Sequence, residues 1–406
     1  MVFLKRIKGL AASNKDVIAV FIGMLVVFLY IMFFANSDLP AHARIARDML
    51  RNNGLVRSNF LMYFMANLLT AFTCYLTPIK LAVVFLLAMA NSAKYAIARE
   101  VFAQSYSLGM ARTLSLSLLV VFIFPVLYLF NLTGCFPVDG GFWDYEVYWK
   151  TTDWYYVPNV WHNSTVIFMM PFAIITYFLS VKQFEVFDRK RNGWITLFVV
   201  LGTLAKPSFF FIYVFAFVVI MFARYRLGKE FFWSLVPVLA GCLCAVYVFA
   251  STFNGSDDNE VAVSIMPVLE HWKPYLLFFV VSMLFPVLFA CCYRKEIRSD
   301  REFWFVLMML IVGIGVYWCC HETGSRAMHG NFWWQTVAAM WFVYYYMLKT
   351  ILKNDLMFDA ESEKIAWSTL SLRGKTFLIA YGLHVLFGVV YLAKIFITQR
   401  YQTGLL

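Results

Sequence analysis

An aspartate and a histidine lie four residues apart, at Asp38 and His42, just beyond the first long apolar run of the chain. If the chain continues there as a helix, the two side chains share one face close to the edge of a membrane. A carboxylate in such a place could act as a general base that activates a hydroxyl group. The alternative is that Asp38 caps a helix that has Pro40 in its first turn. The residues alone favour neither interpretation, and His42 is expected to position or tune Asp38.

A second polar cluster, residues 161–165, contains His162 and Asn163 and opens another apolar run. The N–H groups at a helix N-terminus, joined by His and Asn side chains, form a suitable site for a phosphate or a sugar hydroxyl. The alternative is that Asn163 or Ser164 caps the helix while Trp161 anchors it at the membrane surface. The aromatic loop before this cluster is typical either of a carbohydrate platform or of an interfacial belt.

A lysine and a proline, Lys206 and Pro207, separate two short apolar runs. A lysine in the middle of a membrane costs roughly 2.5 to 3.5 kcal/mol on insertion, so Lys206 is expected to have an anionic partner. A lipid pyrophosphate would serve as that partner. The pair lies either on the external side or in a broken helix within the membrane, and the alternative role for Lys206 is to extend its ammonium group to the lipid head groups.

A fourth cluster, residues 321–331, links two strongly apolar runs and contains Glu322, Arg326, His329 and Asn331. Arg326 could bind a phosphate through two hydrogen bonds, and the glycines of this link allow the backbone to approach a ligand. The spacing of its two histidines and Glu322 matches no standard metal-ligand pattern, so no metal site is predicted.

The composition indicates a polytopic membrane protein, because 62% of the 406 residues are hydrophobic and only 14% are charged, against near 25% in soluble domains. The apolar runs predict a single all-α transmembrane domain over residues 1–406, with about 11–13 transmembrane helices, short external loops and interfacial helices. The net charge of +11 is attributed to cytoplasmic loops, so no nucleic-acid partner is expected.

Loop charges predict how the chain is threaded through the membrane. A basic N-terminus places residues 36–58 in the first external loop, and net acidic charge places residues 132–164, a long aromatic loop, outside as well. Residues 349–375 are predicted to form a cytoplasmic connector. These assignments need an odd number of crossings before residue 132, yet four apolar runs precede it. One segment between residues 59 and 113 is therefore expected to be a half-span, a re-entrant hairpin or an interfacial helix, unless a crossing has escaped detection.

The layout of a first span, an external loop with an acid, and many further spans resembles the GT-C superfamily of integral-membrane glycosyltransferases. It is similar to multi-span proteins of bacterial surface-polysaccharide clusters in three segments: residues 161–165, Lys206-Pro207-Ser208, and residues 322–332. The resemblance implies transfer of a sugar from a polyprenyl-phosphate or polyprenyl-pyrophosphate donor to a saccharide or lipid acceptor on the external face. It also implies a location in the bacterial inner (cytoplasmic) membrane, with the active site facing the periplasm or exterior.

Carried onto this sequence, the resemblance makes Asp38 the catalytic base, or the group that orients the acceptor, and assigns the donor phosphate to Lys206 and Arg326. It also implies that His162, Asn163 and His329 line the pocket. From the same polar clusters, His42, Glu322 and Asn331 are further expected substrate-binding residues. The sequence gives no firm reason to expect a cofactor. Metal-dependent members of the superfamily carry a D-x-D motif in an external loop, and here Asp257 and Asp258 are adjacent instead of being separated by one residue. A divalent cation is therefore not supported.

Other functions remain open from the sequence. A repeat-unit polymerase or ligase for O-antigen or capsule would use similar lipid-linked donors. A transporter or flippase of a lipid-linked oligosaccharide would be favoured by paired broken helices, of which only Lys206-Pro207 gives a hint. A membrane acyltransferase that uses His321 or His329 is a further alternative.

Overall fold

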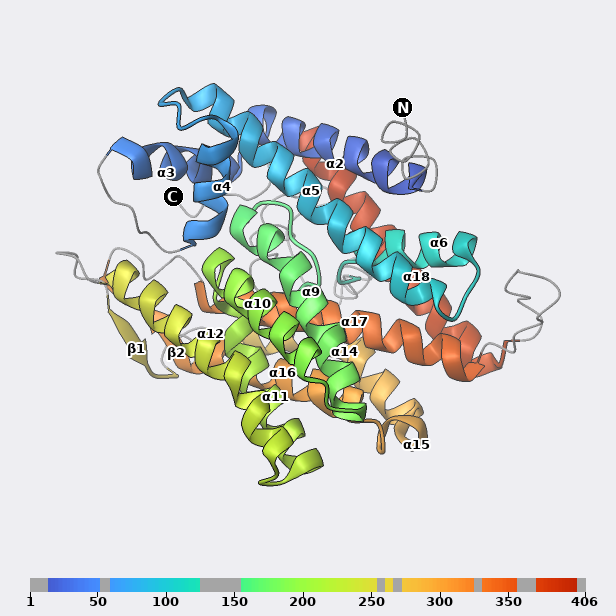
Figure 1. Cartoon of the computed structure of the whole chain (residues 1–406). Coiled ribbons are helices and arrows are strands. Elements are labelled where there is room, and N and C mark those ends of the chain that lie inside the picture. Colours follow the sequence, from blue (N-terminus) through green and yellow to red (C-terminus); the bar gives the residue numbers. More distant parts are fainter. Residues whose placement is uncertain are drawn as a thin grey trace, which may run out of the picture.

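The computed structural model describes residues 14–51, 59–124, 155–253, 260–265, 272–324, 331–355 and 370–399. These residues are largely helical, and Figure 1 shows the helices as a bundle. In chain order the elements are α2 (Lys15–Phe34), α3 (Leu39–Arg51), α4 (Phe60–Leu69), α5 (Leu76–Ala103), α6 (Leu108–Val120), α9 (Ser164–Glu185), α10 (Arg189–Ala205), α11 (Ser208–Tyr225), α12 (Lys229–Phe253), β1 (Val261–Val263), α14 (Trp272–Cys292), α15 (Arg294–Ile297), α16 (Arg301–Cys319), β2 (Cys320–Glu322), η2 (Asn331–Trp333), α17 (Trp334–Asp355) and α18 (Leu372–Thr398).

Seven of the described helices are long and apolar enough to cross a membrane: α2, α5, α9, α11, α12, α16 and α18. An 18-residue helix is about 27 Å long, close to the thickness of the hydrocarbon core. The outer face of α12 exposes Leu239 (62%), Val246 (67%) and Leu243 (73%), which suits contact with lipid better than contact with water. The expected class of helical polytopic membrane protein is thus confirmed, whereas the count of 11–13 helices stays a prediction.

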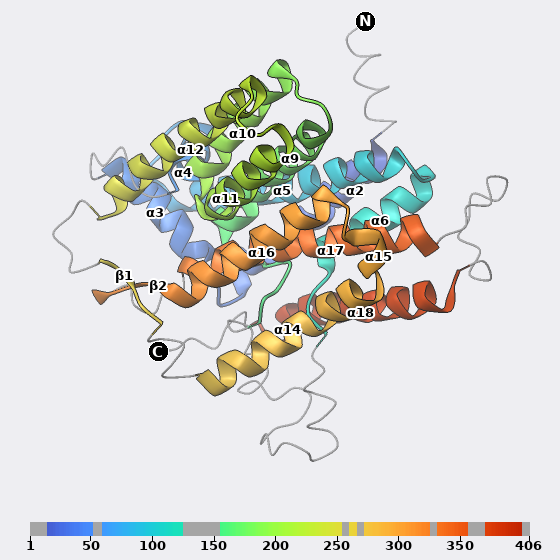
Figure 2. The same ribbon diagram turned by 90° about the horizontal axis from the view of Figure 1, so that it is seen from below.

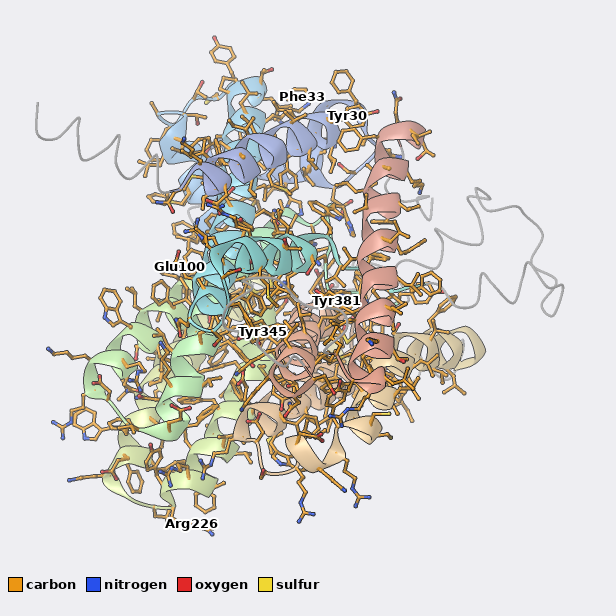
Figure 3. The ribbon with its side chains drawn as sticks, turned by 90° about the vertical axis from the view of Figure 1, so that its right-hand side faces the viewer. Tyr30, Phe33, Glu100, Arg226, Tyr345 and Tyr381 are labelled. Atoms are coloured by element: carbon orange, nitrogen blue, oxygen red, sulfur yellow. The ribbon has the colours of Figure 1, made fainter. Side chains whose placement is uncertain are left out.

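The helices are arranged around α17. In Figure 2, α16 and α17 lie between the group α9 to α12 and the pair α14 and α18, while Figure 1 shows α2 and α5 along another side. Buried aromatic rings fill the interior, as where Tyr177 of α9 stacks on Phe342 of α17 at 4.5 Å between ring centroids. Tyr30 of α2 stacks on Phe396 of α18 and donates its hydroxyl to the carbonyl of Phe396 at 2.7 Å (Figure 3). The bundle is therefore closed by aromatic contacts between helices far apart in the sequence.

The two ends of the bundle differ in their contents. One end, called the site end below, holds the start of α3, the turn between α10 and α11, and the strands β1 and β2, which lie at the left of Figure 1. The other, called the basic end, holds the starts of α2 and α10 together with α15. Arg99 near the end of α5 pairs with Asp16 at the start of α2 at 2.8 Å, so these two helices are antiparallel.

The short helix α4 is one of the segments that bear on the predicted threading. Its ten residues span about 15 Å, half the hydrocarbon thickness. It packs against α3, where the Asn67 side chain donates to the carbonyl of Ala46 at 2.9 Å. Helix α6, with 13 residues, is also shorter than the seven helices that could cross a membrane, so the number of crossings before residue 125 stays a prediction.

The segment around Lys206 and Pro207 is the turn of a helical hairpin. Helix α10 ends just before this pair and α11 begins just after it. The Tyr225 hydroxyl at the end of α11 donates at 2.9 Å to the carbonyl of Gln183, which lies at the end of α9 and therefore close to the start of α10. The two helices therefore run in opposite directions. The alternative of a single broken helix within the membrane does not describe this segment.

Three other expectations need correction or lie outside the described residues. The described part is not purely helical, because β1 and β2 form a two-stranded antiparallel sheet in which Ala262 pairs with His321. The predicted connector 349–375 is shortened at both ends, since α17 continues to Asp355 and α18 begins at Leu372. Most of the predicted loop 132–164 lies outside the described residues; residues 155–163 are irregular and α9 starts at Ser164.

The contact between α6 and α18 requires a glycine at position 388. A Cβ atom added to Gly388 would lie 1.6 Å from the carbonyl oxygen of Val120, and backbone atoms cannot yield as a flexible side chain can. Gly382 lies in the same helix with no atom within 4 Å of such a Cβ.

We predict that Gly388→Ala destabilises the purified protein by about 1 to 3 kcal/mol, the usual range for overpacking, and lowers its melting temperature in detergent. Gly382→Ala is the matched control and should keep or raise the melting temperature, because alanine favours helix formation. Equal melting temperatures for the two variants would contradict the close approach of α6 and α18.

Candidate functional site

Lys206 is the centre of the site end. The turn between α10 and α11 carries it into the protein, where its side chain is 6% exposed. Its Nζ atom donates to the Thr165 hydroxyl of α9 at 3.3 Å and lies 5.3 Å from the ring centroid of Trp334. The ammonium group therefore has a hydroxyl and an aromatic face as neighbours, which replace only part of its hydration.

Two carboxylates act on the charge of Lys206. Burial lowers the pKa of Lys206 to about 7, while the negative charges of Glu322 and then Asp38 oppose this change. An acid from β2 and an acid from the start of α3 therefore both lie near enough to Lys206 for their charges to act on it. Lys206 can thus gain or lose a proton near neutral pH.

Two histidines complete the group and are held in the neutral form. Burial, followed by the charge of Lys206, lowers the pKa of His42 to about 3. The pKa of His162 is also well below its usual value because of burial, followed by the charges of His42 and Lys206. His42 Nδ1 shares a hydrogen bond of 2.7 Å with the Tyr63 hydroxyl of α4, and the ring of His162 lies 5.4 Å from that of Trp334. Both rings can therefore donate or accept hydrogen bonds without adding charge.

Asp38 lies immediately before α3, and its side chain is exposed. Its carbonyl oxygen accepts the first helical hydrogen bond from the backbone N–H of His42 at 3.0 Å, and Pro40 lies in the first turn. The turn before it is fixed to α18, because the N–H of Asn36 donates to the carbonyl of Gln399 at 2.8 Å. The helix start expected for Asp38 is therefore present, and the same geometry leaves its carboxylate beside the Lys206 charge.

Glu322 and Asn331 are brought together by the sheet and the short helix η2. Glu322 ends β2 opposite Val261 of β1 and is 6% exposed. The Asn331 side chain donates to Glu322 Oε2 at 2.6 Å. The carboxylate is thus fixed in position and directed at the interior of the site end.

Asn163 has a structural task in the described structure. Its Oδ1 accepts hydrogen bonds from the N–H of Val166 at 3.1 Å and from the hydroxyl of Thr165 at 2.9 Å, which caps α9. The capping interpretation made from the sequence is therefore confirmed. Asn163 also orients Thr165, the residue that accepts from Lys206.

A second buried lysine holds the irregular segment 155–163 in place. Lys94 of α5 donates to the side-chain oxygen of Asn159, and the Asn159 amide donates to the carbonyls of Leu118 and Val121 at 3.0 and 2.8 Å. The Nζ atom of Lys94 also lies 5.4 Å from the ring centroid of Trp341. These contacts satisfy backbone groups that have no helical partners and fix the position of His162 three residues later.

The structure brings most of the residues expected from the sequence into one group, called the Lys206 cluster below. Its members are Asp38, His42, His162, Lys206 and Glu322, with Asn331 joined through Glu322. The expected residues Arg326 and His329 lie outside the described residues. Two residues that contact the cluster were not expected from the sequence: Trp334 beside Lys206 and Tyr63 beside His42. A signal for Trp334 existed, since it follows the polar link 321–331 directly, whereas Tyr63 lies in an apolar run without any polar neighbour to mark it.

The Lys206 cluster has the parts for anion binding and for proton transfer. A buried ammonium group attracts phosphate, an exposed carboxylate can take a proton from a hydroxyl, and neutral imidazoles can orient either partner. Within the described part of the chain, no three His, Cys, Asp or Glu side chains gather in a way that could hold a metal ion.

No protein-family model matches the chain, and no curated protein sequence matches it either.

Proposed function

We propose that this protein is a membrane glycosyltransferase that takes a sugar from a polyprenyl-phosphate or polyprenyl-pyrophosphate donor and transfers it to an acceptor hydroxyl at the site end. The observation that supports this most strongly is the buried Lys206 at the turn of a helical hairpin, beside an exposed acid and a buried acid. The further expectations proposed with it are a GT-C-like fold, a bacterial inner membrane and a site on the external side.

In the proposed reaction Asp38 takes the proton of the acceptor hydroxyl as its oxygen forms a bond to the anomeric carbon of the donor sugar. The bond between that carbon and the donor phosphate oxygen breaks, and the electron pair leaves with the lipid phosphate. Lys206 in its protonated form stabilises the additional negative charge on this leaving group. Attack from the side opposite the phosphate inverts the configuration of the anomeric carbon.

The surroundings of Lys206 favour a lipid-linked donor. The site end belongs to a bundle of helices that are apolar enough to cross a membrane, so a polyprenyl chain can remain in lipid while its phosphate binds the protein. The ring of Trp334 is buried beside both Lys206 and His162, so it holds the ammonium group in place for the donor phosphate.

We predict that Asp38→Asn lowers the rate of sugar transfer by about 10²- to 10⁴-fold, the usual contribution of a general base, while donor binding changes little. The assay presents the purified protein with a panel of polyprenyl-phosphate- and polyprenyl-pyrophosphate-linked hexoses and measures the release of the free lipid phosphate. Asp48→Asn is the matched control, because Asp48 lies in α3, the helix that begins just after Asp38, and pairs with Arg47 at 2.8 Å on the surface.

Turnover of Asp38→Asn at the wild-type rate would overturn the role of Asp38. The products distinguish the alternatives that the sequence leaves open. Single addition supports the transferase, long products support a polymerase, and movement of the intact donor across a bilayer without release of lipid phosphate supports a transporter.

We predict that kcat/KM for the donor falls above pH 7, by about tenfold for each pH unit, because only protonated Lys206 pairs with phosphate. The pKa of Lys206 is lowered, so its charged form is present below about pH 7 and is lost as the pH rises. His42 is already neutral throughout this range, since its pKa is about 3. Lys206→Arg keeps a positive charge at every pH tested and should remove the alkaline decline. The same decline in this variant would show that Lys206 is not the group that titrates.

A further inference from the structure

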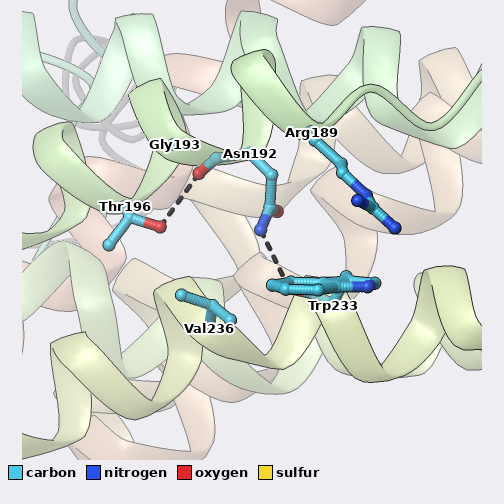
Figure 4. A pocket seen from close by; sticks show the side chains of 6 residues that line it. All are labelled: Arg189, Asn192, Gly193, Thr196, Trp233 and Val236. Carbon is cyan, nitrogen blue, oxygen red and sulfur yellow. Dashed lines mark hydrogen bonds between the residues drawn. The ribbon is translucent and has the colours of Figure 1, made fainter.

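A separate pocket lies at the basic end, between the first turns of α10 and α12. Its volume is about 160 Å³, enough for several water molecules or a small polar head group. Figure 4 shows its lining, which comes from α10 on one side and α12 on the other: Arg189, Asn192, Gly193, Thr196, Trp233 and Val236. None of these residues belongs to the Lys206 cluster.

Two polar groups in the lining of the pocket, the Arg189 guanidinium and Asn192 Oδ1, could make further hydrogen bonds that no described residue supplies. The Arg189 guanidinium lies over the Trp233 ring, 4.9 Å from its centroid, and pairs with no described carboxylate. Asn192 is 4% exposed, and its amide donates to the carbonyl of Trp233 at 2.8 Å. Its Oδ1 is buried and receives no hydrogen bond from the residues that the structure describes. An anion with a hydroxyl donor beside it would satisfy both groups.

The chain around the pocket is positively charged. Residues 188–191 and 226–230 together carry more basic than acidic side chains. Of the acids among them, Asp188 already caps α10 by accepting a hydrogen bond from the N–H of Arg191 at 2.7 Å. The surplus positive charge attracts anionic groups to this end of the bundle.

The opposite wall of the pocket is apolar and continues along the outside of the bundle. Trp233 and Val236 are partly exposed, and Leu239 and Leu243 extend the same outer surface of α12 toward the middle of the helix. A free inorganic anion would make no use of this surface. An acyl chain attached to the anion would cover it.

We propose that this pocket binds the head group of an anionic glycerophospholipid. Arg189 holds the phosphodiester, a hydroxyl of the head group donates to Asn192 Oδ1, and an acyl chain lies along α12 below Trp233. The site is independent of the proposed glycosyl transfer, because it lies at the opposite end of the bundle from Lys206.

The test titrates the full-length protein in detergent with phosphatidylglycerol, and separately with phosphatidylcholine that has the same acyl chains, and reads occupancy by native mass spectrometry. Phosphatidylglycerol should bind about tenfold more tightly, because its head group supplies a hydroxyl to Asn192 and lacks the choline cation, which the basic surroundings repel. Arg189→Gln should weaken the binding of both lipids, since both carry the phosphodiester that Arg189 holds. Lys190→Gln is the matched control, since it removes the same charge one residue away without changing the lining of the pocket.

A second variant tests the pocket without changing any charge. A Cβ atom at Gly193 meets nothing within 4 Å, so Gly193→Leu fills the pocket and should abolish the preference for phosphatidylglycerol. Gly382→Leu, in another helix with equally open space, should keep this preference. Melting temperatures of all variants show whether they are folded.

Three outcomes would overturn the proposal. The first is equal affinity for phosphatidylglycerol and phosphatidylcholine in the wild-type protein. The second is an unchanged preference in a folded Gly193→Leu variant. The third is full displacement of phosphatidylglycerol by millimolar inorganic phosphate, which would show a simple anion site instead of a lipid site.

Discussion

The burial of the Lys206 charge is the constraint on which the site end depends. Removing an ammonium group from water costs several kcal/mol, and the Thr165 hydroxyl and the Trp334 ring offset only part of that free energy. Neighbouring acids must supply the rest, and they come from the start of α3 and from β2, far from Lys206 in the sequence. The positions of α3, of the β1–β2 sheet and of the start of α17 can therefore be understood as the surroundings that this charge requires.

Residues 121–124 and 155–163 are neither helix nor paired strand, and such backbone in a membrane protein must find its hydrogen bonds inside the protein. Buried polar side chains provide them. Asn159 accepts from Lys94 and donates to the carbonyls of Leu118 and Val121 at the end of α6, and His384 of α18 accepts from the N–H of Phe124 at 2.8 Å. These residues stabilise the irregular segments, and the segments in turn place His162 beside Lys206.

The sequence predicts the helical class and most of the Lys206 cluster, because polar residues such as Lys206 and Glu322 are conspicuous among apolar runs. It does not show that α4 fails to cross the membrane, since ten apolar residues look the same in a short helix and in part of a span. Nor does it single out Tyr63 or Trp334, because 19% of the residues are aromatic. Contacts between distant segments decide these points, and local composition carries no information about them.

The proposed reaction assigns different tasks to the two acids, and their surroundings give a physical reason for the difference. Glu322 is buried and held by Asn331, so it can balance the Lys206 charge but cannot readily reach an acceptor. Asp38 is exposed at the start of α3 and still acts on Lys206, so it can meet a hydroxyl group from outside. When a donor phosphate enters, it favours the protonated form of Lys206 and competes with Asp38 for that charge. The donor phosphate and the acceptor hydroxyl are thus met by different charges, the phosphate by Lys206 and the hydroxyl by Asp38.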